Sequence, residues 1–107
     1  MTVLILQGDV ATREMLVREL AALSMSVIEA STIADAKTKQ RPDVILTSWA
    51  LPDGTPRDLS FGVPVIVVSG YAAPPDGSPW NGYWVRKPLH MATLRAALNA
   101  AIGMAGE

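Results

Sequence analysis

The chain has 107 residues and no cysteine, which predicts a single domain over residues 1–107 and excludes disulfides, thiol catalysis and cysteine–zinc sites. Half of the residues are apolar and 18% are charged, a composition typical of a globular protein. The formal net charge of −1 provides no general attraction to nucleic acid or to an anionic membrane surface. The apolar run over residues 3–6 is too short for a signal peptide or a membrane span, so we expect a cytoplasmic protein.

The first half of the chain alternates apolar strands with helices. Residues 3–6 form a continuous apolar run with branched side chains, as a strand buried on both faces does. Asp9 can cap a helix over residues 10–23, whose leucines recur at core-facing spacing. A second strand is expected over residues 26–30, and a short helix over residues 33–39 follows a Ser-Thr capping signal.

The second half continues the alternation with three more strands. They are expected over residues 43–48, 65–69 and 83–86, and the last helix over residues 90–102 carries an apolar stripe. Strands that alternate with helices indicate a parallel α/β sheet with right-handed crossovers. We therefore predict a flavodoxin-like three-layer sandwich with five parallel strands in the order 2-1-3-4-5.

Two connections are too short and too rich in proline and glycine to hold full helices. Residues 53–63 join the third and fourth strands, and residues 70–82, with three prolines and three glycines, join the fourth and fifth. Proline removes a helix donor and clashes with the preceding turn, and glycine costs about 1 kcal/mol inside a helix. We predict one or two turns of helix at most in the first crossover and essentially none in the second.

Three short motifs stand beside strands in an order typical of one known family. Pro42-Asp43 leads into the third strand, Leu51-Pro52-Asp53-Gly54 follows that strand, and Lys87-Pro88 follows the fifth. In order and spacing they resemble the CheY-like receiver domains of bacterial two-component response regulators, and the resemblance covers essentially the whole chain. It implies a fold of the predicted type, with the family's third and fourth helices shortened or absent here.

The resemblance also implies a phosphoryl-accepting pocket at the strand ends. Receivers place an acidic pair after the first strand, an acceptor aspartate after the third, a hydroxyl after the fourth and a lysine before a proline. In this chain Gln7 and Gly8 fall on the acidic pair, and Ser48 falls on the acceptor. Ser69 and Lys87 match the hydroxyl and the lysine. The carboxylates of the pocket are therefore replaced, while the hydroxyl and the cation remain.

These replacements predict that the pocket no longer accepts a phosphoryl group. Phosphoryl transfer to a carboxylate needs an acceptor aspartate and Mg²⁺, which binds carboxylate oxygens and water. Serine cannot form an acyl phosphate, and no general base stands beside Ser48 in the sequence. Asp9 lies one place beyond the acidic pair, where acids of the family do not usually hold the metal. We expect no metal site, no cofactor and no enzyme activity, but a degenerate receiver that acts by protein–protein contact in a phosphorelay pathway.

An alternative keeps a function for the remaining polar groups. Asp9, Ser69 and Lys87 could still bind an anion, a phosphoryl group or a small ligand as a switch. Lys87 could equally be a relic that hydrogen-bonds strand-end carbonyls or Asp9, with Pro88 in cis. An enzyme on the same scaffold is disfavoured, because no glycine-rich phosphate loop follows the first strand.

Aromatic residues gather around strands three to five, where the crossovers are short. A parallel sheet must be covered on both faces, and the first and last helices can cover only one. Either the loop aromatics fold back over the sheet, or they form an exposed contact face, because Trp and Tyr are enriched at interaction hot spots. The partner would be a signalling protein or a second copy of the chain, with no direct binding of nucleic acid or membrane. The predicted interaction face comprises Phe61, Tyr71, Trp80, Tyr83 and Trp84.

Overall fold

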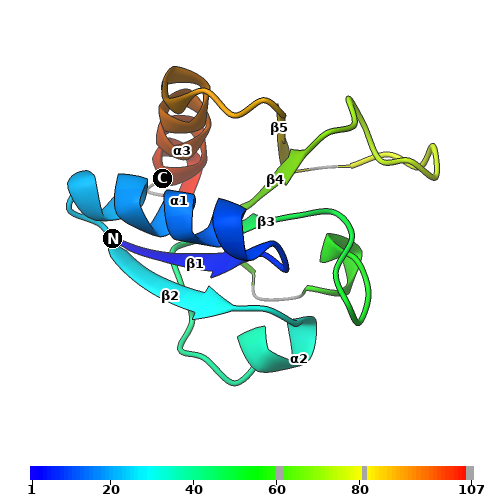
Figure 1. Ribbon diagram of the computed structural model, residues 1–107, viewed down its shortest axis with the longest axis horizontal. Helices are drawn as coiled ribbons and strands as arrows, with labels where there is room; N and C mark the ends of the chain where they lie inside the picture. The colour runs from blue at the N-terminus through cyan, green and yellow to red at the C-terminus, as the bar shows by residue number, and fades with distance from the viewer. Residues whose placement is uncertain (60–61, 81, 106–107) are drawn as a thin grey trace.

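The computed structural model describes residues 1–59, 62–80 and 82–105 and confirms the predicted alternation of strands and helices. The elements in chain order are β1 (Thr2–Leu6), α1 (Val10–Ala22), β2 (Ser26–Ala30), α2 (Ile33–Ala36), β3 (Val44–Thr47), the 3-10 turn η1 (Pro56–Asp58), β4 (Val65–Ser69), β5 (Tyr83–Arg86) and α3 (Met91–Ala105). The strands pair in parallel in the order β2-β1-β3-β4-β5, as predicted (Figure 1). Their carboxyl ends therefore lie along one edge of the sheet, where ligand sites of such folds form.

The helices differ from the prediction mainly at their ends. Asp9 caps α1 as predicted, because its carboxylate accepts a hydrogen bond from the Thr12 N–H at 3.1 Å. Leu23, expected in the core, follows the last residue of α1 and is only partly buried. α2 stops at Ala36 and not at residue 39, because the N–H groups of residues 38 and 39 bond three residues back and tighten the chain into turns. Within the described residues, no helix is long and apolar enough to cross a membrane.

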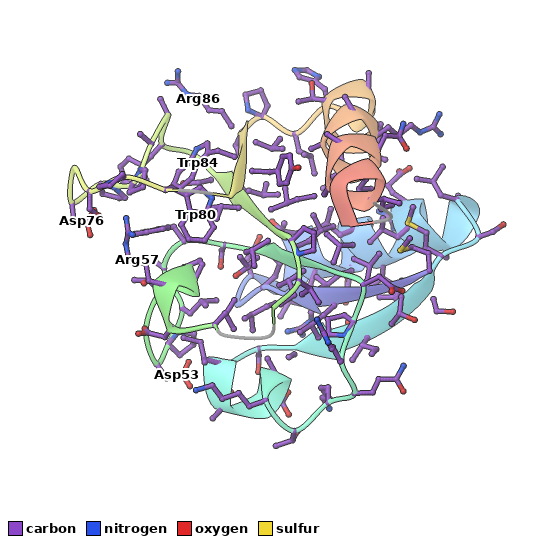
Figure 2. The ribbon with its side chains drawn as sticks, turned by 180° about the vertical axis from the view of Figure 1, so that it is seen from behind. Asp53, Arg57, Asp76, Trp80, Trp84 and Arg86 are labelled. Atoms are coloured by element: carbon purple, nitrogen blue, oxygen red, sulfur yellow. The ribbon has the colours of Figure 1, made fainter. Side chains whose placement is uncertain are left out.

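The two short crossovers hold little helix, as predicted. In the described part of the β3–β4 crossover the only helical turn is η1, which a capping box begins: the Asp58 carboxylate accepts from the Thr55 N–H at 3.0 Å. Residues 70–80 and 82, between β4 and β5, contain no helix. Figure 2 shows that Arg57 of η1 and Asp76 of the β4–β5 crossover lie on the same side of the molecule. Loops thus occupy the places that helices fill in other α/β sandwiches.

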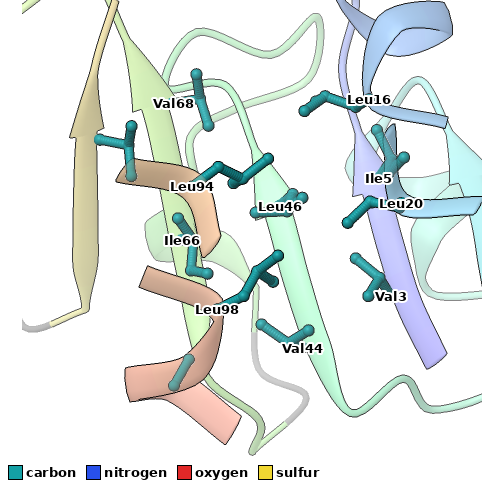
Figure 3. Close-up of a cluster of buried hydrophobic side chains, with 12 residues drawn as sticks. Val3, Ile5, Leu16, Leu20, Val44, Leu46, Ile66, Val68, Leu94 and Leu98 are labelled. Atoms are coloured by element: carbon teal, nitrogen blue, oxygen red, sulfur yellow. The ribbon is translucent and has the colours of Figure 1, made fainter. Parts of the chain in front are cut away.

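Two apolar cores lie on opposite faces of the sheet. α1 and α3 cover the first face, where Leu16 and Leu98 meet buried side chains of β1, β3, β4 and β5 (Figure 3). On the second face, α2 packs on residues of β1, β2 and β3. Val67 of β4 is nevertheless fully buried. Since α2 does not reach β4 and β5, something other than a helix must cover the second face there.

Candidate functional site

The carboxyl ends of β3 and β4 form a cavity of about 280 Å³. Ser48, Ser69 and Lys87 all line it, so the structure brings together three residues of the predicted pocket. Backbone hydrogen bonds hold them there: the Ser48 N–H donates to the Leu6 carbonyl at 3.2 Å, and the Lys87 N–H donates to the Ser69 carbonyl at 2.7 Å. The Lys87–Pro88 peptide bond is cis, as anticipated.

The residues after β1 do not join this cavity. Gln7, Gly8 and Asp9 are missing from its lining. Gln7 is buried, and neither atom of its side-chain amide has a hydrogen-bond partner within the described residues. A buried amide without partners is costly, so Gln7 is not a satisfied substitute for a metal-binding carboxylate. Gly8 faces open space: a side chain built there would meet no atom within 4 Å.

Asp9 and Lys87 lie close enough to interact electrostatically but do not form an ion pair. Hydrogen bonds from the Thr12 hydroxyl and backbone N–H lower the pKa of Asp9, and the charge of Lys87 lowers it further. The Asp9 carboxylate is turned toward its own helix as a cap, and the Lys87 side chain is exposed. The hydrogen bond considered from Lys87 to Asp9 or to a strand-end carbonyl is therefore not formed within the described residues.

The groups at the pocket do not fit Mg²⁺. This ion prefers carboxylate oxygens, and Ser48 supplies only a hydroxyl, which donates weakly to the Ala50 carbonyl at 3.4 Å. Across the part of the chain that the structure describes, no three His, Cys, Asp or Glu side chains are grouped so that they could hold a metal ion. Ser48, Ser69 and Lys87 bring two serine hydroxyls and one ammonium to the pocket.

Asp53, the acid of the turn after β3, has a structural role that the sequence did not reveal. Its two carboxylate oxygens accept hydrogen bonds from the backbone N–H groups of Ile33 and Ala34, at 2.8 and 3.0 Å. These hydrogen bonds lower the pKa of Asp53. The carboxylate thus holds the first turn of α2 against the β3–β4 crossover, and is not available to the pocket.

Three tryptophans cover the second face where helices are missing. Trp49 is 8% exposed, and its ring centroid lies 5.8 Å from that of Trp80, edge to face, and 5.7 Å from that of Trp84. The indole N–H of Trp80 donates to the Tyr83 carbonyl, and that of Trp84 to the Tyr71 carbonyl. The polar atom of each of these two rings is therefore satisfied. This tryptophan cluster (Trp49, Trp80 and Trp84) supports the interpretation in which loop aromatics fold back over the sheet.

Arg57 ties the two short crossovers together over the tryptophan cluster. Its guanidinium lies 5.2 Å from the centroid of the Trp49 ring. The same group donates to the Pro79 carbonyl at 2.6 Å and to the Ser78 hydroxyl. Asp76 accepts hydrogen bonds from Ser78, which lower the pKa of Asp76. We call these Arg57 contacts the Arg57 clamp; sequence reasoning missed them because no local pattern marks a contact across more than 20 residues.

The structure divides the predicted interaction face. Tyr83 packs against the core under α3, whereas Trp84 lies on the second face, since successive side chains of a strand point to opposite faces. Tyr71 is 59% exposed and does not cap the sheet. Trp84 lines a separate cavity of about 250 Å³, and only Trp49 among the tryptophans lines the Ser48–Lys87 pocket itself. Phe61 lies outside the described residues.

No family model and no curated protein matches this sequence. Solved structures do resemble it. The receiver domain of the PhyR response regulator from Erythrobacter litoralis matches with a TM-score of 0.82 and 23% identity, over 95% of this chain and 89% of that one. A two-component response regulator from Clostridium difficile matches with a TM-score of 0.80 and 19% identity, over 99% and 98%. The chain has the receiver fold.

A third receiver structure bears on the pocket. The receiver domain of the sensor histidine kinase PA1611 from Pseudomonas aeruginosa matches with a TM-score of 0.74 and 20% identity, over 95% of this chain and 97% of that one. That protein holds a magnesium ion in its active-site cleft. The receiver fold of the present chain surrounds a pocket whose residues do not fit that ion.

Proposed function

We propose that this receiver-fold domain no longer accepts a phosphoryl group and acts in two-component signalling through phosphorylation-independent protein contact. The observation that carries the proposal is the set of residues at the strand ends: Gln7, Gly8 and Ser48 stand where the receiver pattern has carboxylates. A serine hydroxyl cannot form the acyl phosphate, and no carboxylates are placed to recruit Mg²⁺ against the phosphoryl charge. Phosphoryl transfer would then have neither an acceptor nor a bound metal at this pocket.

The second face supports a contact function. A groove of about 570 Å³ runs between η1 and the β4–β5 side of the sheet, lined by Leu59, Val65 and Trp80 among others, with Arg57 beside them. A receiver with full crossovers would cover this region with helices. Apolar surface that the described residues leave open is the kind of surface that protein partners bury.

The test is phosphoryl transfer from acetyl phosphate in the presence of Mg²⁺, read by intact mass, with beryllofluoride binding read by tryptophan emission. We expect no adduct and no change in emission, because neither reagent finds an aspartate acceptor. The control is a receiver with a complete set of carboxylates, which must react under the same conditions. The Lys87→Ala variant should behave as the wild type does. A phosphoryl adduct on the wild-type chain, at Ser48 above all, would contradict the proposal.

One observation favours a second candidate function, an anion-sensing pocket. The Lys87 ammonium lines the cavity with Ser48 and Ser69 and has no hydrogen bond or ion pair to any described residue. The Ser69 hydroxyl accepts a hydrogen bond from the Tyr71 N–H at 3.1 Å, which leaves its own proton free to donate to an anion. Asp9 does not line the cavity, so the anion would rest on Ser69 and Lys87.

Tryptophan emission tests this second candidate, since Trp49 lines the same cavity. Inorganic phosphate or sulfate should change the emission at saturable concentration, and Lys87→Ala should abolish the change. Lys37→Ala, which removes an exposed lysine on the α2 side, serves as the matched control. Emission that does not respond to either anion in the wild-type chain rules this function out.

A further inference from the structure

The groove of about 570 Å³ lies at the amino ends of β4 and β5, at the opposite end of the sheet from the pocket that Ser48 lines. Val65 and Tyr83, the first residues of the two strands, line it with Leu59 and Trp80 of the two crossovers. We propose that this groove binds a partner segment of one chemistry, an acidic stretch that carries a leucine or an aromatic anchor. The inference rests on the proposed contact function and names the kind of partner.

Apolar side chains that the fold leaves partly open line the groove. Leu59, Val63 and Val65 pack against the core of the second face and remain partly exposed. The Trp80 side chain is also partly exposed, and it lies close to the chain at Gly82, where a Cβ would come within 2.8 Å of the indole nitrogen. Partly exposed apolar side chains around a hollow are the kind of site into which a partner inserts an apolar anchor.

Two arginine guanidinium groups border the groove. Arg57 of η1 lines it, and Arg41 donates a hydrogen bond at 3.0 Å to the carbonyl of Gly62, which also lines it. Both arginines are exposed, and neither forms an ion pair with a residue that the structure describes. Asp76 interacts with Arg57 through its charge, but it accepts its hydrogen bonds from Ser78 and does not line the groove. The positive rim therefore favours a partner with carboxylates beside its apolar anchor.

Both guanidinium groups still have N–H groups to offer to a partner. In Arg57 the hydrogen bonds to Ser78 and to the Pro79 carbonyl both use Nη2, and none to a described residue uses Nε or Nη1. Arg41 likewise uses Nη2 alone. Asp43, which lines the adjacent cavity with Arg41, has its carboxylate engaged by the N–H at the start of β1. A guanidinium has five donors in a planar fork, so each arginine can bind a partner carboxylate and keep its present contacts.

A proline-rich segment, which aromatic grooves of other proteins recognise, fits this groove less well. Such a segment presents backbone carbonyls and no carboxylate for the guanidinium groups. The indole N–H of Trp80 donates to the Tyr83 carbonyl at 3.2 Å, so this ring has no donor left for a bound backbone. A basic segment would be repelled by both arginines. The chemistry of the groove thus favours the acidic segment with an apolar anchor.

Selection from a library of short random peptides displayed on phage tests the chemistry of the partner without assuming its sequence. We expect the wild-type chain to enrich peptides that place aspartate or glutamate beside leucine, phenylalanine or tryptophan. When added to the chain, an enriched peptide should shift the backbone amide NMR signals of Leu59, Val65 and Tyr83. The proposal is overturned if no peptide is enriched, if the enriched peptides are basic or proline-rich, or if the shifts gather at Ser48 and Lys87 instead.

Charge reversal tests the role of the arginines. Arg41→Glu should raise the dissociation constant of an enriched acidic peptide about three- to tenfold, measured by fluorescence polarisation, because an attraction becomes a repulsion. This variant leaves the Arg57 clamp in place, and its amide spectrum reports whether the fold is kept. Arg95→Glu makes the same charge change on the exposed side of α3 and should leave the constant unchanged. Equal binding by the wild type and a folded Arg41→Glu overturns the proposal.

Salt dependence adds a readout that a purely apolar groove would not give. Raising the salt concentration should weaken the complex of the wild-type chain with an acidic peptide, because salt screens exposed charges. The effect should be smaller for Arg41→Glu, and binding of the wild type that does not respond to salt contradicts the charge complementarity. The two proposals fail separately. An acetyl phosphate adduct would refute only the loss of phosphoryl transfer, whereas a failed peptide selection would refute only the acidic partner.

Discussion

Removing the guanidinium of Arg57 should loosen the β4–β5 crossover and lower the stability of the domain. Arg57→Ala loses the cation–π contact over Trp49, which contributes about 0.5–1 kcal/mol of stability. It also loses two hydrogen bonds, which contribute about 0.5–1.5 kcal/mol each. Because Arg57 is exposed, solvent screens these contacts and the sum must be discounted. We expect the free energy of unfolding to fall by about 1–2 kcal/mol, which lowers the melting temperature by about 5–10 °C.

Urea unfolding, followed by tryptophan emission, measures this change, and amide exchange adds a local signal. The Ser78 N–H donates to Asp76 beside the clamp, so its exchange should accelerate in Arg57→Ala more than exchange in β1 does. Arg57→Lys keeps a cation near the Trp49 ring but loses the planar guanidinium that reaches Ser78 and Pro79. Its free energy of unfolding should therefore lie between those of the wild type and Arg57→Ala.

Arg95→Ala is the matched control, because Arg95 is an exposed arginine of α3 with no hydrogen bond or ion pair to a described residue. If Arg57→Ala and Arg95→Ala unfold at the same urea concentration with the same emission spectrum, the clamp does not stabilise the tryptophan cluster. The account of how loops replace helices on the second face would then be wrong.

Three further predictions concern single positions. Ser48→Asp alone should remain unmodified by acetyl phosphate and Mg²⁺ in intact-mass measurements, because the acidic pair is still missing; an adduct would contradict this. Gly54→Ala should lower the free energy of unfolding by about 2–4 kcal/mol in thermal melts, since Gly54 has φ 149° and a Cβ there would lie 2.3 Å from the Asp58 carboxylate. The pKa of Asp53 is lowered from 3.8, so its ionised form stabilises the fold above that pH and this contribution disappears as the pH falls through the lowered value. In Asp53→Asn the free energy of unfolding should therefore decrease less as the pH falls through the acid range. An unchanged pH dependence would contradict the role of the Asp53 carboxylate at the start of α2.

The architecture could be predicted from the sequence because it depends on local signals. Continuous apolar runs mark buried strands, and the alternation of strands with helices restricts the topology to few arrangements. The prolines and glycines of residues 70–82 exclude a helix wherever the segment lies. The resemblance to receivers predicted that Ser48, Ser69 and Lys87 meet, and they do so where the strand ends share one edge of the parallel sheet.

The placements of the Asp9 and Tyr83 side chains could not be predicted from the sequence. The sequence placed Asp9 near the pocket, but the carboxylate is held by its own helix start and does not line the cavity. Tyr83 and Trp84 are neighbours in the chain, yet the pleat of β5 sends them to opposite faces, and only the register on β4 determines which one meets α3.

The sequence by itself determined the alternation of strands with helices, the shortness of the crossovers and the absence of carboxylates at positions 7, 8 and 48, since each follows from residue types at consecutive positions. The tertiary structure alone decided how the second face is covered. Arg57 reaches Ser78 and Pro79, and Asp53 reaches the start of α2, across about 20 residues in each case. Such contacts depend on where the folded backbone brings two loops together, and no spacing along the chain encodes that meeting.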